Sequence, residues 1–346
     1  MTRLQFRPPD HDHEHFLLTT VVGSYPQPEW LDRIRALHAD GAVSDEVRDE
    51  AVEDAVRAAV TDQQNAGLDV VTDGEMRREG MVDYFTNFIH GYDPAGDDGD
   101  SSDWNAQMPT VTDTVETEAP WLVDDFRFAD SVAARPVKTT ITGPFTMASF
   151  SSLEAYDDVE QLAYDFADLI AAEAGRLADA GANYIQVDEP ALGMSPHGAI
   201  AHECLSRIAA EIPDDVRFGV HVCSGNYANL ADDMFEFPVD ELDLEFGSDD
   251  ADPVAEVFAD ADLSMDVGLG VVDTTSREPE TVEAVKENIR AGLEFIPPDR
   301  LTVSPDCGLK PLPRDVAREK LTNMVQAARE VEAELDAGDV EPVADE

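Results

Sequence analysis

A histidine and a cysteine separated by one residue, His221 and Cys223, are the side chains in this sequence best suited to bind a metal. They end an apolar run that begins at Phe218 and is typical of a buried strand followed by a Gly/Asn turn. Alternate residues of a strand point to the same side, so the strand would present the imidazole and the thiol together. The alternative is structural: a cysteine packed as a small core residue and a histidine with a buried hydrogen-bond partner.

Two further residues end later apolar runs in the same way. Glu245 ends a short run after residue 241, and Cys307 follows a run that begins near residue 300. One histidine, two cysteines and one glutamate form a plausible four-coordinate zinc set. The third cysteine, Cys204, lies in an amphipathic segment and is expected in a helix core. A disulfide is disfavoured by the odd cysteine count and by the lack of a signal-peptide pattern.

The charge balance excludes several classes of partner. The chain has 23 Lys and Arg against 75 Asp and Glu, a formal net charge of −52. Such a surface repels nucleic acid and anionic lipid, so neither is an expected partner. The acidic residues are spread along the chain, which predicts adaptation to a high-salt cytoplasm where screening weakens self-repulsion. No apolar run approaches the ~18 residues typical of a membrane span, and the predicted location is the cytoplasm.

Eight apolar runs have the length and composition of strands. They lie near residues 18, 70, 139, 185, 219, 243, 266 and 302. Most alternate with amphipathic helices, which predicts an α/β fold, a parallel (β/α)8 TIM barrel. A doubly wound sheet is the alternative, but no G-x-G-x-x-G motif follows the first run.

The barrel is expected to occupy one domain, residues 16–336, with an insertion after the second strand at about 80–135. Within the insertion, residues 110–116 and the segment after them predict a hairpin, and the whole stretch is a candidate cover for the site. A flexible tail with three alternating histidines is predicted over residues 1–15, and an acidic tail over 337–346.

Polar residues follow most of the predicted strands. They are Ser24, Glu75, Asp188, Glu189, His221, Cys223, Glu245, Asp273 and Cys307. In a parallel barrel these positions share the carboxyl-terminal face, where such enzymes carry their active sites. The distribution therefore predicts a single catalytic site at that face.

Seven motifs, six of which contain one or more of these residues, follow one another along the chain. They are Val22-Gly-Ser24-Tyr-Pro-Gln, Thr72-Asp-Gly-Glu75, Ile141-Thr-Gly-Pro-Phe, Gln186-Val-Asp188-Glu189-Pro-Ala, His221-Val-Cys223, Leu244-Glu245-Phe and Pro305-Asp-Cys307-Gly. In this order they resemble the catalytic barrel of the cobalamin-independent methionine synthase family, in the short core form found in archaea. The resemblance extends over about residues 16–335.

The resemblance implies a zinc-dependent methyltransferase that moves a methyl group onto the thiol of homocysteine to form methionine. The implied zinc ligands are His221, Cys223, Glu245 and Cys307. The implied homocysteine-binding residues are Ser24, Glu75 and Asp188, with the two carboxylates at the ammonium group. The implied chemistry is reasonable because a free thiol has a pKa of about 8.5, whereas a metal-bound thiol is deprotonated. Glu189 is expected to have a structural role.

The sequence departs from the family in two respects. The family places a histidine, as proton donor, in a D-x-H-S motif, and this chain has Asp273-Thr274-Thr275-Ser276 there. Thr275 cannot act as a general acid near neutral pH. Long members also carry an additional half that helps to bind polyglutamylated folate, which this sequence does not include. The methyl donor is therefore either methyl-tetrahydrofolate bound in a different manner or a methylated corrinoid protein.

Three other functions remain as alternatives. A related zinc enzyme could alkylate a different thiol acceptor. A decarboxylase of the uroporphyrinogen type could use a similar barrel, although its polyacid substrate is poorly matched by this charge balance. A non-catalytic protein stabilised by zinc is the third.

Overall fold

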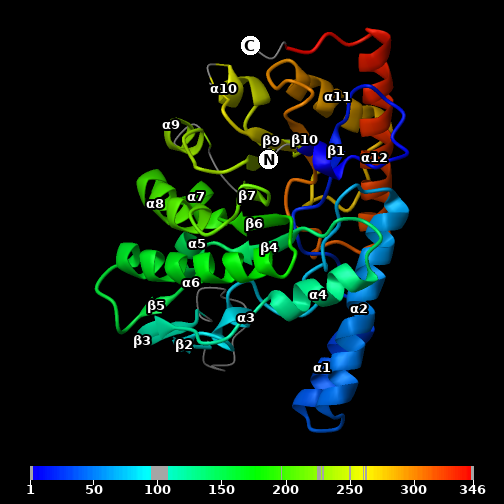
Figure 1. The fold of residues 1–346 in the computed structure, drawn as a ribbon. Coiled ribbons are helices and arrows are strands. Elements are labelled where there is room, and N and C mark those ends of the chain that lie inside the picture. The colour runs from blue at the N-terminus through cyan, green and yellow to red at the C-terminus, as the bar shows by residue number, and fades with distance from the viewer. Residues whose placement is uncertain are drawn as a thin grey trace.

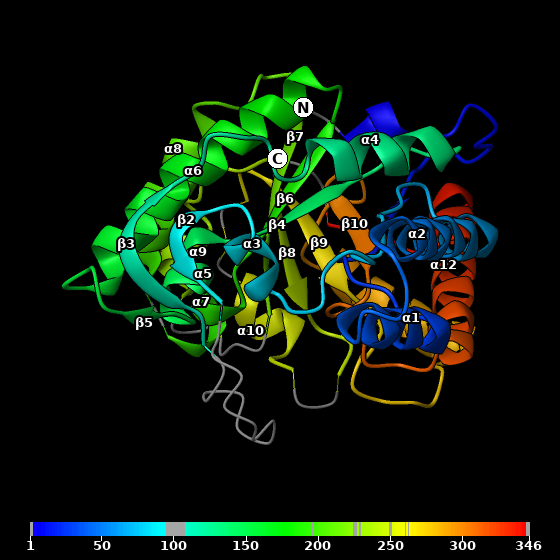
Figure 2. The same ribbon diagram turned by 90° about the horizontal axis from the view of Figure 1, so that it is seen from below.

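The computed structural model describes residues 3–94, 108–195, 197–223, 227, 230–248, 251–259, 261 and 263–343. At its centre is a curled sheet of seven parallel strands in the order β1-β10-β9-β8-β7-β6-β4. Figures 1 and 2 show these strands at the centre with helices packed around them. The strands are β1 (Leu18–Thr19), β4 (Thr139–Thr142), β6 (Tyr184–Asp188), β7 (Arg217–Val222), β8 (Glu241–Glu245), β9 (Asp266–Gly270) and β10 (Leu301–Ser304).

The gap between β1 and β4 is bridged by the segment predicted as the second strand. The backbone N–H groups of Asp69 and Val70 donate to Thr19 O at 3.1 and 3.2 Å, and Val71 pairs in parallel with Val137. All eight predicted runs thus line the same α/β barrel, and the predicted fold is confirmed. The second run makes few ladder hydrogen bonds, and only the pair Val71 and Val137 forms a bridge there.

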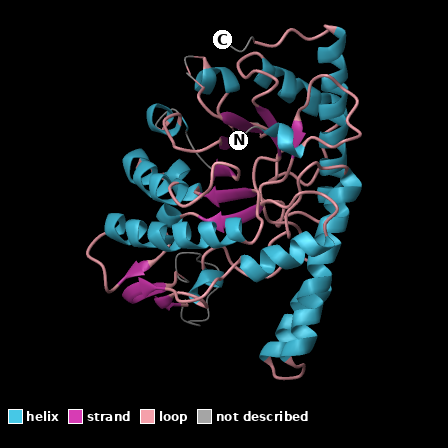
Figure 3. Ribbon diagram, in the orientation of Figure 1, coloured by secondary structure: helices cyan, strands magenta, loops and turns pink. Residues whose placement is uncertain are grey.

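Helices cover the outside of the sheet (Figure 3). They are α1 (Glu29–Ala39), α2 (Asp45–Ala66), α4 (Val123–Val132), α5 (Pro144–Ser149), α6 (Val159–Asp179), α7 (Pro190–Met194), α8 (Gly198–Ala209), α9 (Ala231–Met234), α10 (Val254–Phe258), α11 (Val282–Leu293) and α12 (Arg314–Ala337). The long helix α6 begins at Val159 because Asp158 caps it by accepting from Gln161 N. None of the described helices is both long and apolar enough to cross a bilayer.

The insertion forms a small second sheet beside the barrel. Its elements are α3 (Asp83–Thr86), β2 (His90–Asp93) and β3 (Thr110–Glu116), and β5 (Ser152–Leu153) joins them from outside it. The predicted hairpin is wrong in its partner, because β3 pairs antiparallel with the preceding β2 and parallel with β5. The segment after β3 is instead held at α6, where Trp121 N and Leu122 N both donate to Glu173 Oε1. Residues 95–107 of the insertion lie outside the described residues.

The N-terminal segment makes defined contacts with the barrel. Phe6, in a short 3-10 helix over Arg3–Phe6, stacks at 5.5 Å on Tyr184 of β6. His13 Nδ1 and His15 Nδ1 lie 3.0 and 2.9 Å from the two carboxylate oxygens of Asp336 in α12. The described part of the predicted flexible tail therefore packs along β6 and α12. The domain limits themselves stay a prediction.

The junction between β1 and the second run depends on a buried carboxylate, which gives a testable prediction. Asp69, 1% exposed, accepts from Thr19 N and Thr19 Oγ1 and pairs with Arg329 Nη2 at 2.6 Å. Asp69→Ala leaves these donors unpaired, and we expect the free energy of unfolding to fall by about 3 kcal/mol. Urea denaturation measures this. The exposed Asp54→Ala is the control and should change stability by less than about 0.5 kcal/mol; equal effects would contradict the prediction.

Candidate active site

One histidine and two cysteines from distant parts of the chain meet at the carboxyl ends of the strands. The ligand atoms of His221, Cys223 and Cys307 all lie within 4.8 Å of one another, and the two sulfurs are 3.6 Å apart. Two sulfurs bound at about 2.3 Å to one tetrahedral zinc ion are about 3.8 Å apart. The sulfur spacing therefore fits a shared metal ion. Cys204, as predicted, is buried in α8.

The imidazole of His221 is oriented for a metal. Its Nδ1 lies 2.6 Å from Asp243 Oδ2, and its buried Nε2 has no hydrogen-bond partner among the described residues. An unpartnered buried nitrogen is costly, and metal-binding histidines commonly donate their other N–H to a carboxylate. Asp243 also accepts from Ser304 Oγ at 2.6 Å, at the end of β10. One carboxylate thus connects the strand of His221 to the strand that leads to Cys307.

The neighbours of Cys307 favour its deprotonation. Cys223 beside it, together with His221, holds the pKa of the Cys307 thiol well below its ordinary value. A lowered thiol pKa favours the anionic form, which is the form that binds metals.

The fourth predicted ligand, Glu245, ends the neighbouring strand β8. It is not part of the three-residue group that the described side chains form. Tyr227 joins the two strand ends, since its hydroxyl donates to Val222 O at 2.9 Å and accepts from Glu245 N at 3.0 Å. This tyrosine holds the backbone of Glu245 one strand away from the histidine and cysteine.

Asp306 was not singled out by its type or spacing, yet it supports the same region. Its Oδ1 accepts from Phe246 N at 3.1 Å and Gly247 N at 2.7 Å, which ties the Cys307 loop to the residues after Glu245. Burial raises the pKa of Asp306 to about 7. The only sequence signal for this role was the position of Asp306 next to a predicted ligand.

Asp188, which is predicted to bind the ammonium group of the substrate, lies beside His221 of the histidine and cysteine group. It ends β6, and its register partner in β7 is His221. Gln186 Nε2 donates to Asp188 Oδ1 at 2.7 Å, and Lys138 Nζ donates to Gln186 Oε1. Because an ammonium group only donates, Lys138 fixes which way the Gln186 amide points. Burial and the charge of Glu75 raise the pKa of Asp188 to about 7.

Glu75 and Ser24 occupy the same end of the barrel. Glu75 has a left-handed backbone, φ 55°, and its Oε1 accepts from Thr140 Oγ1 at 3.0 Å. A Cβ on Gly23 would lie 2.4 Å from Glu75 Oε1, and one on Gly308 would lie 2.1 Å from Ser24 Oγ. The absence of a side chain at these two glycines therefore leaves space for the side chains of Glu75 and Ser24, which are predicted to bind the substrate. A left-handed non-glycine residue costs on the order of 1 kcal/mol, so the surroundings must hold Glu75 in place.

The remaining strand-end residues have local roles. Asp273 Oδ1 accepts from both Thr275 N and Thr275 Oγ1 at 2.7 Å, a turn closed on its own loop. The carboxylate of Glu189 accepts from Phe145 N and Thr146 N at 3.0 and 2.8 Å, at the start of α5. The expected structural role of Glu189 agrees with these contacts.

A parallel α/β barrel that gathers an imidazole and two thiols at its carboxyl-terminal face defines a metal-binding barrel enzyme with a thiolate-rich centre. The comparison with protein families is more specific. Residues 17–330 match the family described as "Cobalamin-independent synthase, Catalytic domain". The chain therefore belongs to the catalytic-domain family of cobalamin-independent methionine synthases, and the sequence-based resemblance is confirmed.

Individual relatives agree over nearly the whole chain. The methionine synthases of Sulfurisphaera tokodaii and Sulfolobus acidocaldarius are each 39% identical over 326 residues, 94% of this chain and 95% of each relative. Among solved structures, the B12-independent methionine synthase of Shewanella sp. W3-18-1 in complex with selenomethionine superposes with a TM-score of 0.80 at 26% identity, covering 93% of this chain and 99% of that one. The putative enzyme of Listeria monocytogenes, 20% identical with a TM-score of 0.75 over 93% and 99% of the two chains, shares the fold.

The contacts of Asp243 give the second prediction. Asp243→Asn and Ser304→Ala each disturb the group that fixes the His221 ring, so we expect Zn²⁺ affinity to fall 10- to 100-fold. Chelator competition measures the affinity, and the spectrum of the Co²⁺-substituted protein reports the ligand geometry. Thr302→Val is the matched control because Thr302 lies on the same strand but donates to Glu241 instead. If the control lost as much affinity as Ser304→Ala, Asp243 would have no special connection with the metal.

Proposed function

We propose that this chain transfers a methyl group to the thiol of homocysteine, forming methionine, with zinc held by His221, Cys223, Cys307 and Glu245. Membership of the family supports the reaction class. The zinc assignment is based on the two sulfurs of Cys223 and Cys307, which lie close to His221. The buried Nε2 atom of His221 has no hydrogen-bond partner among the described residues.

The metal would supply one property that the side chains lack. Zinc, when bound, stabilises the thiolate of an incoming thiol, which is mostly protonated at neutral pH. His221 and the two cysteines come from strand ends held by Asp243 and Asp306, so the ligands are positioned before any substrate binds. Glu245, on the neighbouring strand, is the fourth ligand in this proposal.

Homocysteine would lie across two adjacent strands. Neighbouring strands are about 4.8 Å apart, close to the distance that separates the amino group of homocysteine from its sulfur. Asp188 is beside His221 in register, and Glu75 interacts electrostatically with Asp188. An ammonium group beside Asp188 would favour the ionised form of that carboxylate. Ser24 then provides a hydroxyl next to the loop of Cys307.

The methyl donor is the finer part of the proposal. The position of the family's proton donor is held by Thr275, whose neighbour Asp273 is engaged by its own loop. A methyl-corrinoid donor needs no protonated leaving nitrogen, whereas methyl-tetrahydrofolate does. We therefore propose a corrinoid donor or a folate bound in a different manner. Single-turnover assays with each donor distinguish the two, and acceptor profiling tests the alternative of another thiol substrate.

Removing one thiol should remove the metal. We expect Cys307→Ala to lower bound zinc from about one per chain to a small fraction and to lower kcat at least 100-fold, because the three remaining proposed ligands cannot hold the ion as tightly as four. Metal analysis by mass spectrometry measures the content. Cys204→Ala, which deletes a buried thiol in α8 away from the site, should keep its zinc. A Cys307→Ala protein with full zinc content would contradict the proposed centre.

Ammonium recognition by Asp188 can be measured through substrate preference. Wild type should favour homocysteine over 4-mercaptobutyrate, which lacks the amino group. Loss of a charged hydrogen bond costs about 2 kcal/mol, so Asp188→Asn should raise KM for homocysteine about 30-fold and reduce that preference. The exposed Asp168→Asn serves as control. An unchanged preference in Asp188→Asn would show that this carboxylate does not contact the amino group.

A further inference from the structure

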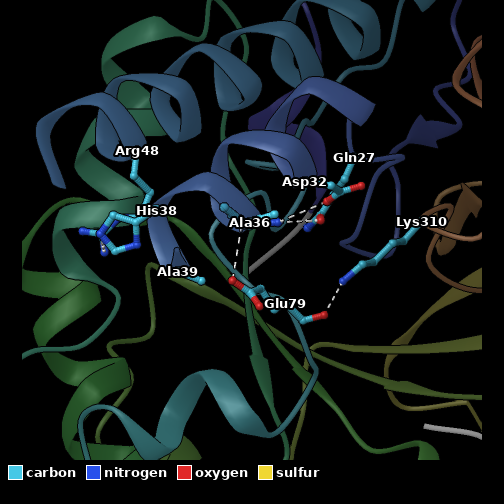
Figure 4. Close-up of a pocket in the computed structure, with 9 residues that line it drawn as sticks. Gln27, Asp32, Ala36, His38, Ala39, Arg48, Glu79 and Lys310 are labelled. Atoms are coloured by element: carbon cyan, nitrogen blue, oxygen red, sulfur yellow. Dashed lines mark hydrogen bonds and ion pairs between the residues drawn. The ribbon is translucent and has the colours of Figure 1, made fainter. Parts of the chain in front are cut away.

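A cavity of about 700 Å³ lies next to the predicted substrate residues, between α1, the start of α2 and loops that follow three strands (Figure 4). Three of its lining residues, Gln27, Glu79 and Lys310, each follow an active-site residue by three or four positions in the sequence. The cavity therefore adjoins the carboxyl-terminal face of the barrel. Its volume is in the range of small-molecule sites.

Two cations are held rigidly in this cavity by uncharged oxygens. Arg35 Nη1 donates to Gln27 Oε1 at 2.7 Å, and Arg35 Nη2 donates to Met76 O at 2.5 Å. Lys310 Nζ donates to Glu79 O at 2.7 Å, the contact drawn in Figure 4. These amide and carbonyl oxygens fix the two side chains without neutralising their charge.

The acidic side chains nearby compensate this charge only weakly. Arg35 is 12% exposed, whereas the carboxylates closest to it, Glu79 at 3.5 Å and Asp32 at 3.8 Å, are 76% and 65% exposed. Ion pairs with such exposed partners contribute about 0–1 kcal/mol. Burial lowers the pKa of Arg35 and of Lys310, and the nearby carboxylates offset this lowering only in part.

The other two basic residues of the cavity are already engaged. His38 and Arg48 lie on the opposite side from Lys310 in Figure 4. His38 contacts Asp45 at 2.7 Å, and Arg48 contacts Asp49 at 2.8 Å. Among the described residues of this cavity, Arg35 and Lys310 are therefore the cations that have no carboxylate at hydrogen-bond distance.

We propose that Arg35 and Lys310 bind an anionic group of the methyl donor, a carboxylate or a phosphate. The inference rests on the proposed function, because the neighbouring carboxylates Glu75 and Asp188 suit the cationic end of the acceptor. A chain of net charge −52 repels an anionic donor, so binding next to the site requires local positive charge. Folates carry glutamate carboxylates and cobalamins carry a phosphodiester, so either donor class has a suitable group.

The test compares the double variant Arg35→Gln/Lys310→Gln with wild type by titration calorimetry. The probes are methyl-tetrahydrofolate with one and with three glutamates, methylcobalamin, free γ-triglutamate and inorganic phosphate. One of the anionic probes should bind wild type most tightly. In the double variant, we expect the affinity for that probe to fall at least tenfold and to lose its dependence on salt. The affinity for homocysteine should not change. A triglutamate preference identifies a carboxylate site, and binding of phosphate and methylcobalamin identifies a phosphate site. The conservative Lys310→Arg should retain binding.

The matched control is Arg33→Gln/Arg127→Gln, which removes the same charge from side chains that are 78% and 62% exposed outside the cavity. Equal effects of the two double variants, or no binding of any anionic probe to wild type, would overturn the inference. If a free probe distinguishes the variants while no donor methylates homocysteine, the anion site stands and the proposed function fails. If methyl transfer occurs and the two double variants behave alike, the proposed function stands and the anion site fails.

Discussion

The hydrogen bond between Asp243 and His221 is the contact on which the active site depends. It directs one imidazole nitrogen toward the two sulfurs, and that buried nitrogen has no hydrogen-bond partner in the part of the chain that the structure describes. The same carboxylate accepts from Ser304, so the strand ends before Cys307 and at His221 are held at a constant separation. A metal centre whose ligands come from distant parts of the chain needs this kind of support, since each ligand alone would lose its position with small movements of its strand.

Charge is distributed unevenly around this centre. The charge of Glu75, together with burial, raises the pKa of Asp188, and an added cation beside Asp188 would lower it again. Arg35 and Lys310 supply the opposite charge, and they donate to the carbonyls of Met76 and Glu79 in the segment that follows Glu75. Donor and acceptor could thus be distinguished by charge at neighbouring positions. This local arrangement matters more for recognition than the net charge of −52, which acts over longer distances and is screened by salt.

A network of buried polar and charged side chains lies inside the barrel. Arg217 pairs with Glu241 and Asp266 at 2.7 Å, and Glu241 also accepts from Thr302. Buried charges are tolerated only when paired and hydrogen-bonded. This network underlies the site and connects most of the strands that carry it. Adaptation to high salt and a cytoplasmic location, by contrast, remain predictions from composition.

The sequence by itself determined the strand positions, the family and the residue types at the strand ends. Apolar runs of strand length alternating with amphipathic helices are local signals, and His221, Cys223 and Cys307 were identified because a parallel barrel brings all strand ends to one face. Only the tertiary structure decided what depends on neighbours across strands. The pairing of β3 with the preceding β2, the support from Asp243, Tyr227 and Asp306, and the cation pair of Arg35 and Lys310 join residues far apart in the chain. No local pattern specifies such contacts, because they arise from strand register and packing once the barrel has formed.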